Sequence, residues 1–334
     1  MSTVNNGPQI VRSGLVLDLD ASSVTSYSAI AVYKVECYST FGGGLRSANY
    51  TVQYSDDNST WTTAFTGVMS NNSSCGIITG TNRNDSNYSK HRYWRYVEGG
   101  AVVGHHPRVS RIDFITKSGA VYNLVTSTTD NCSDSGVYII GTQTKDFGGT
   151  TWRDTSGSGN NGTFGASTAA PTYSNQNGGS LVFDGSNDYI TTSFATTSGQ
   201  AVSYCGWVYS TESTATYKNF VDSLSESPMI WWNTSGQIEF DATRYTTTTV
   251  YRNQWVYVSL SKPAGNSSAS YYVNGVLVGT GTAYTTLVST PTLFNRGAAQ
   301  TWKGNGAVVQ IYNIALSAAQ VLQNYNATKG RFGL

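Results

Sequence analysis

The chain has 334 residues, with 20 Lys and Arg against 19 Asp and Glu, a net charge of +1 and a charged fraction of 12%, about half that of typical globular proteins. A protein that binds nucleic-acid phosphates or an anionic membrane surface should carry a basic excess, so neither partner is expected. The 39% of hydrophobic residues, with 23 Tyr and 8 Trp, exclude wholesale disorder. Ser, Thr, Asn and the 35 Gly supply the polarity, and this composition predicts an all-β fold.

Short alternating runs predict many strands and one helix. The Asn274-Gly275 pair lies between two apolar runs and predicts a tight hairpin. Ser317 and Gln320 form a capping box that predicts a short amphipathic helix at 317–327. Many short strands with a single helix indicate an antiparallel β-sandwich. In chain order, strands are expected at 14–20, 50–54, 93–97, 109–116, 180–184, 188–193, 202–209, 229–232, 237–241, 255–261, 269–273 and 306–312.

The first residues and the cysteines indicate the cellular compartment in which the chain is made. The chain starts without the basic and apolar segments of a signal peptide, and no apolar run reaches the roughly 18 residues of a membrane span. We therefore expect synthesis in a host cytoplasm and no membrane insertion. Cys37, Cys75, Cys132 and Cys205 are far apart and include no Cys-x-x-Cys pair, which favours buried free thiols over disulfides or a zinc site.

Five segments carry a family resemblance: GLVLDLDA at 14–21, TWRDTSGSGNNG at 151–162, GSLVFDGSNDY at 179–189, YVNG at 272–275 and IYNIALS at 311–317. They resemble the concanavalin A-like, laminin G-like sandwich domains found in tailed-phage virion proteins. In that family the first two segments are separated by a short connection. Here the second arrives about 120 residues late. Because domains are tolerated as insertions in surface loops, we expect a discontinuous sandwich formed by 1–27 and 148–334, with a separate domain at 28–147.

The expected insert has a resemblance of its own. The segments YTVQYSDDNSTW at 50–61, RYWRYV at 92–97 and PRVSRIDF at 107–114 are similar to the discoidin jelly roll, which has a galactose-binding-like fold. The insert lacks the bridging cysteine pair of that family. This resemblance implies a second β-sandwich inserted in a loop of the first.

Catalytic candidates are weak. The sandwich superfamily includes glucanases, and retaining glycosidases place two carboxylates about 5 Å apart. Glu239 and Asp241 share a strand face, but Arg244 stands where the second glutamate of the glucanase pattern is needed. Asp18 and Asp20 also share a face, but they lie in the family's opening strand. We expect no enzyme, and a glycan-cleaving enzyme is the weaker alternative.

Two further patterns have simpler interpretations. Residues 157–162 satisfy Gly-x-Gly-x-x-Gly, but the sequence after them does not open a helix, so a turn is expected instead of a dinucleotide site. His91, His105 and His106 lie in the expected insert. Since neighbouring strand residues point to opposite faces, His105 and His106 make a poor metal chelate, and loop histidines are expected.

Calcium is the one candidate cofactor. Asp184, Asn187 and Asp188 place two carboxylates and an amide in one turn, and calcium prefers such oxygens. Laminin G-like relatives often bind calcium. The alternative is ordinary turn chemistry between two strands.

Aromatic residues are the candidates for glycan contact. Trp231 and Trp232 are neighbours on an expected strand, so one should pack inside while the other faces out as a platform for a sugar ring. Trp232, Tyr245 and Tyr251 are the expected ligand-binding residues. The alternative is core or cross-strand packing.

These observations lead to one functional hypothesis with a rival. We expect a non-enzymatic, multimeric virion protein of a tailed phage, either a capsid decoration protein or one associated with the tail or its fibres. Its partners would be other virion proteins and host-surface carbohydrate. Many weak contacts acting together could bind the carbohydrate. The rival is a purely architectural capsid or tail component without a ligand.

Overall fold

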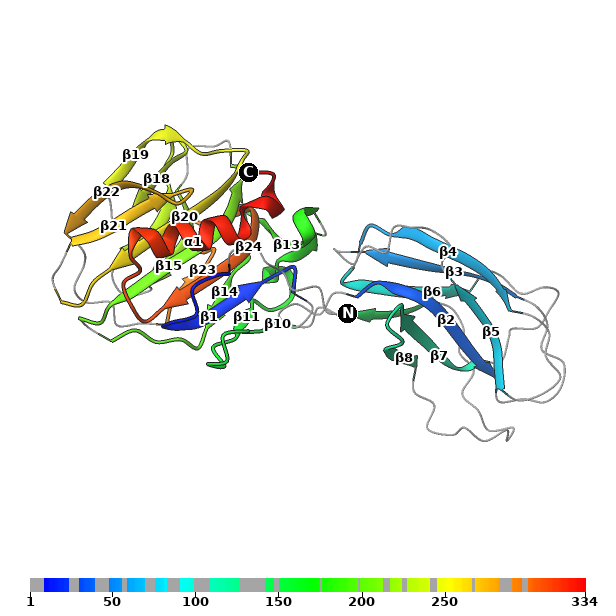
Figure 1. Cartoon of the computed structure of the whole chain (residues 1–334). Coiled ribbons are helices and arrows are strands. Elements are labelled where there is room, and N and C mark those ends of the chain that lie inside the picture. Colours follow the sequence, from blue (N-terminus) through cyan, green and yellow to red (C-terminus); the bar gives the residue numbers. More distant parts are fainter. Residues whose placement is uncertain are drawn as a thin grey trace. The chain divides into compact units, whose positions relative to one another are not determined.

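The computed structural model describes residues 9–23, 30–39, 48–55, 59–69, 76–82, 91–98, 109–125, 142–146, 150–174, 176–197, 199–212, 217–223, 227–240, 245–265, 268–282, 290–295 and 300–334 (Figure 1). The chain divides into two compact units. The larger unit consists of Met1–Tyr27 and Thr150–Leu334, and the smaller unit of Ser28–Gly149.

The described residues of the larger unit form two antiparallel sheets of eight strands each. The first sheet has the order β12 (Thr172–Ser174), β13 (Ser180–Asp184), β24 (Lys303–Tyr312), β15 (Val202–Ser210), β20 (Trp255–Lys262), β21 (Ser268–Val273) and β22 (Val276–Thr282), and β1 (Leu15–Asp20) also pairs with β24. The second sheet has the order β10 (Thr151–Trp152), β11 (Gly162–Phe164), β14 (Ile190–Thr192), β23 (Thr292–Leu293), β16 (Lys218–Ser223), β17 (Ser227–Trp232), β18 (Gln237–Phe240) and β19 (Tyr245–Val250). Three-residue 3-10 turns lie at η1 (Ser167–Ala169) and η2 (Gln176–Gly178).

Strand alternation builds the core of the larger unit. Leu17 and Leu19 of β1 are fully buried, as the period of two in a strand requires when one face meets a core. Strand β15 is different, because all but one of its residues are buried. A central strand is buried along both of its faces when both faces of its sheet are covered.

The second cover of the first sheet is the helix α1 (Ala318–Thr328) with the 3-10 turn η3 (Lys329–Phe332) (Figure 1). The Trp207 ring of β15 stacks on Phe332 with a centroid separation of 4.2 Å and on Tyr325 at 5.7 Å. Ser317 and Gln320 form both hydrogen bonds of the capping box. The predicted helix and its N-cap are therefore confirmed.

The Asn274-Gly275 turn is also confirmed as a two-residue hairpin, since it joins β21 directly to β22. Both residues have positive φ, 51° and 79°, as the preferred hairpin turn requires. The turn lies against α1. A Cβ atom on Gly275 would stand 3.0 Å from Leu322 Cδ1, so glycine serves the packing as well as the backbone.

In the part of the smaller unit that the structure describes, the strands form two antiparallel sheets of four strands each. Their orders are β5 (Gly76–Asn82), β2 (Val32–Ser39), β7 (Val109–Thr116) and β8 (Val121–Val125), and β4 (Thr62–Met69), β3 (Ala48–Ser55), β6 (Tyr93–Glu98) and β9 (Thr142–Asp146). Aromatic and β-branched side chains from both sheets form one buried cluster, which consists of Val32, Val35, Tyr50, Val52, Trp94, Tyr96, Ile112 and Phe114. The predicted all-β fold with one short helix is confirmed.

Two expectations, the buried free cysteines and the lack of a membrane span, can be compared with the described residues. Cys205 is a free, buried thiol, and burial raises its pKa to about 11, which keeps it uncharged. The side chains of Cys37, Cys75 and Cys132 lie outside the described residues. Among the helices in the described part of the chain, none has the length and apolar character needed to cross a membrane.

Candidate functional site

A row of polar and aromatic side chains crosses the second sheet of the larger unit on the face away from its core. Strand register places Asn219 opposite Trp231, Trp231 opposite Glu239, and Glu239 opposite Thr246. At the other end of the row, Asn219 Nδ2 donates to Gln300 Oε1 at 3.0 Å. We call Gln300, Asn219, Trp231, Glu239 and Thr246 the outer-face row.

The alternation of these strands explains why the row is polar. On β17, Ile230 and Trp232 point into the core and Trp231 points away from it, because successive strand residues alternate faces. Trp232 packs edge-on against the buried Trp302, with centroids 4.8 Å apart. On β18, Ile238 and Phe240 are fully buried on either side of Glu239.

Hydrogen bonds fix the middle of the row. Trp231 Nε1 donates to Glu239 Oε2 at 2.6 Å, and Asn233 Nδ2 donates to Glu239 Oε1 at 2.9 Å. Both carboxylate oxygens of Glu239 therefore accept hydrogen bonds from neighbouring strand or turn residues. This contact pattern fits a positioned acceptor at the surface of the sheet better than a general acid, which would need to hold and release a proton.

Asn219 is the least satisfied member of the row. Its side chain is 1% exposed, and its Oδ1 atom has no hydrogen-bond partner in the described part of the molecule. A buried acceptor in this state costs free energy unless water or a ligand supplies a donor. The atom therefore marks a place where a donor is needed.

An exposed aromatic ring flanks the row. Tyr217 immediately precedes β16 and is 41% exposed. Its ring stands edge-on to the Trp231 indole with centroids 6.3 Å apart. Neither Tyr217 nor Asn219 was predicted from the sequence. Their position beside Trp231 depends on the register of β16 with β17, for which the sequence carries no local signal.

The expected platform at Trp232 is wrong. The alternation argument correctly placed Trp231 and Trp232 on opposite faces, but neither indole is exposed: Trp231 is 5% and Trp232 is 2% exposed. Trp232 Nε1 donates to the Tyr251 backbone oxygen at 2.8 Å, as a buried indole requires. Trp231 is buried because it lies among Tyr217, Asn219 and Glu239 on the outer face.

The two predicted tyrosines are partly exposed but do not join the row. The Tyr245 ring stacks on the buried Tyr271 at 5.7 Å and covers Gly279 of β22, where a Cβ atom would stand 2.3 Å from the Tyr245 ring. It closes one edge of the sandwich. Tyr251 contributes its backbone to the Trp232 contact and to a hydrogen bond with the Gly236 oxygen. Packing therefore describes the Tyr245 side chain better, whereas the binding role of the Tyr251 side chain stays a prediction.

The predicted calcium turn is held by its own backbone. Asp184 Oδ1 accepts from Ser186 N at 2.7 Å, and Asp188 Oδ2 accepts from Asp184 N at 2.8 Å. Asn187 Nδ2 donates to Thr168 Oγ1 at 3.1 Å. Within the described residues, no group of three His, Cys, Asp or Glu side chains could hold a metal ion. These contacts favour turn chemistry over a calcium site.

Burial gives Asp188 a pH dependence that can be measured. Loss of solvation raises its pKa to about 6, the Asp184 N–H bond opposes this, and the Asp184 charge adds to it. The folded protein therefore binds this proton more tightly than the unfolded chain, whose Asp pKa is about 3.9. Stability from this group is fully present below about pH 4 and is lost as the pH rises through the folded pKa of about 6.

Asp188→Asn should remove this component. Denaturant unfolding of the wild type and the variant, measured from about pH 4 to about pH 8, should give a difference curve that changes between about pH 4 and about pH 7, through the folded pKa of about 6, and is flat above. Burial also raises the pKa of Asp18, so the difference between the two curves isolates Asp188. A difference that does not vary with pH would contradict the assignment.

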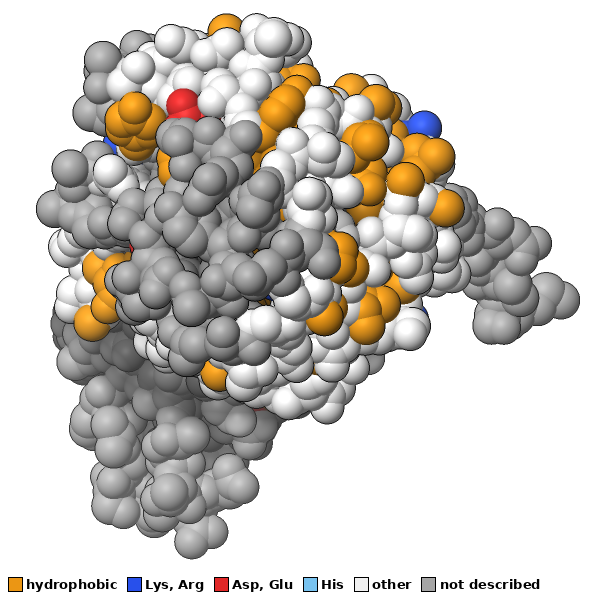
Figure 2. Space-filling model, turned by 90° about the vertical axis from the view of Figure 1, so that its left-hand side faces the viewer, with side chains coloured by type: hydrophobic (Ala, Val, Ile, Leu, Met, Phe, Trp, Pro, Cys, Tyr) orange, Lys and Arg blue, Asp and Glu red, His pale blue; other side chains and the backbone are white. Residues whose placement is uncertain are grey.

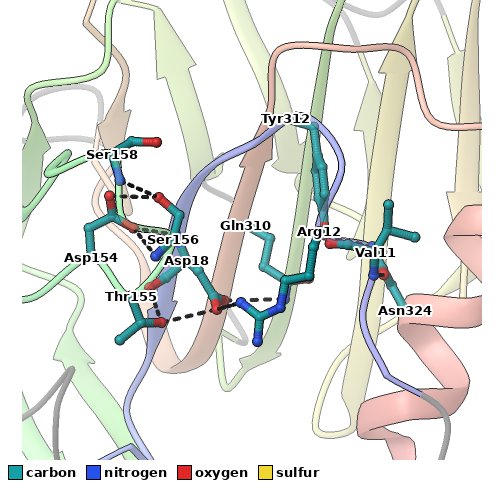
Figure 3. A network of polar contacts seen from close by, with 10 residues as sticks. All are labelled: Val11, Arg12, Asp18, Asp154, Thr155, Ser156, Ser158, Gln310, Tyr312 and Asn324. Carbon is teal, nitrogen blue, oxygen red and sulfur yellow. Dashed lines mark hydrogen bonds and ion pairs between the residues drawn. The ribbon is translucent and has the colours of Figure 1, made fainter.

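The glycine-rich segment at 157–162 is a turn, as expected. Gly157 and Gly159 have φ of 91° and 76°, and the segment leads into β11 instead of a helix. It therefore lacks the helix N-terminus that binds a dinucleotide phosphate. Asp154 organises the segment (Figure 3). Its carboxylate accepts from the backbone N–H groups of Asp18, Ser156 and Asn160 at 2.8 to 2.9 Å and from Ser156 Oγ at 2.9 Å.

The remaining catalytic and histidine candidates either form contacts that hold the fold together or lie outside the described residues. Asp18 Oδ2 accepts from Thr155 Oγ1 at 3.0 Å, and Asp18 Oδ1 accepts from Gln310 Nε2 at 3.2 Å (Figure 3). His91 is buried and stacks on Tyr54 with centroids 3.6 Å apart, so the expectation of a loop histidine is wrong for it. Residues 105–106, 241 and 244 lie outside the described residues.

Charge is sparse on the described part of the face that Figure 2 shows. In Figure 2 the visible side chains are mainly uncharged polar or apolar, with few acidic or basic groups. This agrees with the low charged fraction of the sequence.

A family comparison supports the fold of the larger unit. Residues 184–322 match the family described as the concanavalin A-like lectin/glucanases superfamily. The matched residues lie within the larger unit, and the matched family is the one that the sequence segments resemble. No curated protein sequence matches the chain.

Solved structures with low similarity cover about half of the chain. Domain 4 of an extracellular arabinanase from Geobacillus stearothermophilus, in complex with arabinotriose, is 21% identical with a TM-score of 0.38, and the match covers 52% of this chain and 91% of that one. The binding domain of Paraclostridial Mosquitocidal Protein 1 is 11% identical with a TM-score of 0.44, covering 52% and 49%. Trypanosoma rangeli sialidase is 15% identical with a TM-score of 0.43, covering 55% and 32%. This chain therefore spans half or less of the last two proteins.

Proposed function

We propose that this chain is a non-enzymatic structural protein of a tailed-phage virion that binds host-surface carbohydrate through the outer-face row of its larger unit. The observation that carries the carbohydrate proposal is the buried, unsatisfied Asn219 oxygen beside the exposed Tyr217 ring. An aromatic ring packs against the apolar face of a sugar. An amide oxygen accepts a hydrogen bond from a sugar hydroxyl, and because the Asn219 oxygen is buried in the unliganded chain, the proposal requires the side chains above it to move aside when the sugar binds.

The rest of the row suits the same ligand. Glu239 and Thr246 add a carboxylate and an exposed hydroxyl group in register with Asn219. Few convergent polar groups beside an aromatic surface are the usual composition of a small-molecule site. Low charge leaves each contact weak, and many copies on a particle would raise the avidity.

The particle assignment is supported by sequence and chemistry. The segments at 14–21, 151–162, 179–189, 272–275 and 311–317 resemble those of phage virion sandwiches. The smaller unit, which we assign as discoidin-like, adds a second β-sandwich of the kind used for surface recognition. The protein is multimeric in the particle, with other capsid or tail proteins as partners, and its free Cys205 suits synthesis in a reducing cytoplasm.

Catalysis is not part of the proposal. The two oxygens of Glu239 are committed to Trp231 and Asn233. A retaining glycosidase needs a second carboxylate about 5 Å away as nucleophile or acid. Release of reducing ends from a bound polysaccharide would overturn the non-enzymatic assignment.

A glycan array of the full chain, displayed on multivalent beads, tests the binding site. We expect Asn219→Ala and Tyr217→Ala each to weaken binding about tenfold, as loss of a central contact does. Thr191→Ala is the matched control, because Thr191 is exposed on β14 of the same sheet but lies outside the row. Melting curves should show that all three variants fold.

Two outcomes would contradict the proposal. No binding to any multivalent glycan would leave only the architectural role, and unchanged binding by both row variants would move the site elsewhere. Separately, density maps and mass spectrometry of purified phage particles test the location. Absence of the chain from the particles would overturn the virion assignment.

A further inference from the structure

The smaller unit has an aromatic and basic cluster on the outer face of its β4–β3–β6–β9 sheet. Tyr50 and Val52 of β3 point into the core, so Gln53 lies on the opposite face. Arg95 of β6 likewise lies between the buried Trp94 and Tyr96. Register places Gln53 opposite Arg95 on one side and opposite Thr63 of β4 on the other.

Two contacts fix the Arg95 side chain in this face, and a third fixes the Gln53 side chain that Arg95 contacts. Arg95 Nε donates to Gln53 Oε1 at 2.8 Å, and Gln53 Nε2 donates in turn to Thr63 Oγ1 at 3.2 Å. The guanidinium carbon lies 4.0 Å from the centroid of the Trp61 ring. This distance is well inside the range of a cation–π interaction. The plane of the guanidinium is thus set before any ligand arrives.

Within the described residues, the outward end of the guanidinium has no partner. Arg95 and Trp61 are partly exposed, and within the described residues the Nη1 and Nη2 groups form no hydrogen bond or ion pair. Two parallel N–H groups of an arginine fit the two oxygens of a carboxylate. A side chain already held by stacking and a hydrogen bond loses little freedom on binding.

We propose that the Trp61–Arg95–Gln53 face of the smaller unit binds the carboxylate of an acidic sugar. This inference rests on the proposed function for its choice of a glycan over another anion. The Thr63 hydroxyl and the Gln53 amide beside Arg95 favour a ligand rich in hydroxyl groups. In a chain with so few charges, one oriented arginine supplies selectivity for charged over neutral sugars.

Polygalacturonate and its methyl ester are a matched pair of probes, because they share one sugar backbone and differ in the carboxylate. The full chain should bind immobilised polygalacturonate and bind the ester at least about tenfold more weakly. Arg95→Gln should abolish this preference. Arg95→Lys, which keeps the charge but loses the planar fork, should retain only part of it.

The control is Lys117→Gln, which removes one positive charge from the exposed turn between β7 and β8, in the other sheet of the same unit. It should leave binding unchanged. Equal loss in Lys117→Gln and Arg95→Gln would show nonspecific charge attraction and overturn the site. Equal binding of polymer and ester, or no binding of either, would overturn the carboxylate assignment, and equal competition by polyglutamate would assign the site to acidic peptides.

The two glycan proposals fail separately. If neutral-glycan binding depends on Asn219 and polygalacturonate does not bind, only the Arg95 site is wrong. If polygalacturonate binding depends on Arg95 and Asn219→Ala changes no glycan interaction, only the outer-face row is wrong. Melting curves of each variant keep unfolding apart from loss of binding.

Discussion

Asp154→Ala should lower the free energy of unfolding of the larger unit by about 3 kcal/mol, since hydrogen bonds to charged groups are worth about 1.5 to 3 kcal/mol each and this carboxylate is only partly buried. The substitution removes four hydrogen bonds, three of them from backbone N–H groups of Asp18, Ser156 and Asn160. Denaturant unfolding followed by tryptophan fluorescence measures the loss.

A second carboxylate provides the control. Asp184 is exposed and accepts one backbone hydrogen bond, from Ser186, so Asp184→Ala should cost about 1 kcal/mol or less. Asp154→Asn keeps an acceptor oxygen and should lie between the two. Equal losses in Asp154→Ala and Asp184→Ala would contradict the view that Asp154 organises its loop.

The Asp154 loop explains how the larger unit accommodates a break in its chain. The smaller unit, Ser28–Gly149, lies between β1 and β10 in the sequence. Asp154 accepts the Asp18 N–H, and Thr155 N donates to the Asp18 oxygen at 2.9 Å. The chain segments before and after the smaller unit are therefore hydrogen-bonded to each other. Insertions are tolerated where the two ends lie close together in this way.

Local patterns predicted the local structure well. The Asn274-Gly275 turn requires positive φ at both residues, and the Ser317 capping box supplies donors and acceptors within one helical turn. Each depends on residues that are neighbours in sequence. The alternation of Leu17 and Leu19 with Asp18 likewise follows from the strand period alone.

The candidate site was harder to predict from the sequence. Alternation placed Trp231 and Trp232 on opposite faces, but it does not say what covers the outer face. Asn219 and Tyr217 reach Trp231 only through the register of β16 with β17, which contains a bulge after Asn219. An extra residue in one strand shifts which side chains meet, so the outer-face row needs the pairing as well as the period.

Polar contacts between residues far apart in the chain also could not be predicted from sequence patterns. Asn324 lies on α1, where its spacing suggests an ordinary buried helix position. Its carboxamide is fully buried and accepts the Val11 N–H at 2.7 Å while it donates to the Tyr312 hydroxyl at 2.9 Å (Figure 3). Tyr312 completes the ring by donating to the Val11 oxygen at 3.2 Å. Burial raises the pKa of Tyr312 well above its ordinary value, so the hydroxyl keeps the proton that it donates.

Asn324→Ala should therefore destabilise the larger unit by about 3 kcal/mol, because it leaves the buried Val11 N–H without an acceptor and opens a small cavity. Asn324→Asp keeps the acceptor but places a carboxyl group in a dry site, which favours its protonated form. Its stability should fall as the pH rises above about 4. Denaturant unfolding at pH 4 and pH 7 checks both variants. If Asn324→Asp matches the wild type at pH 7, or if Asn324→Ala costs under about 1 kcal/mol, the network does not anchor the segment at Val11 to the helix.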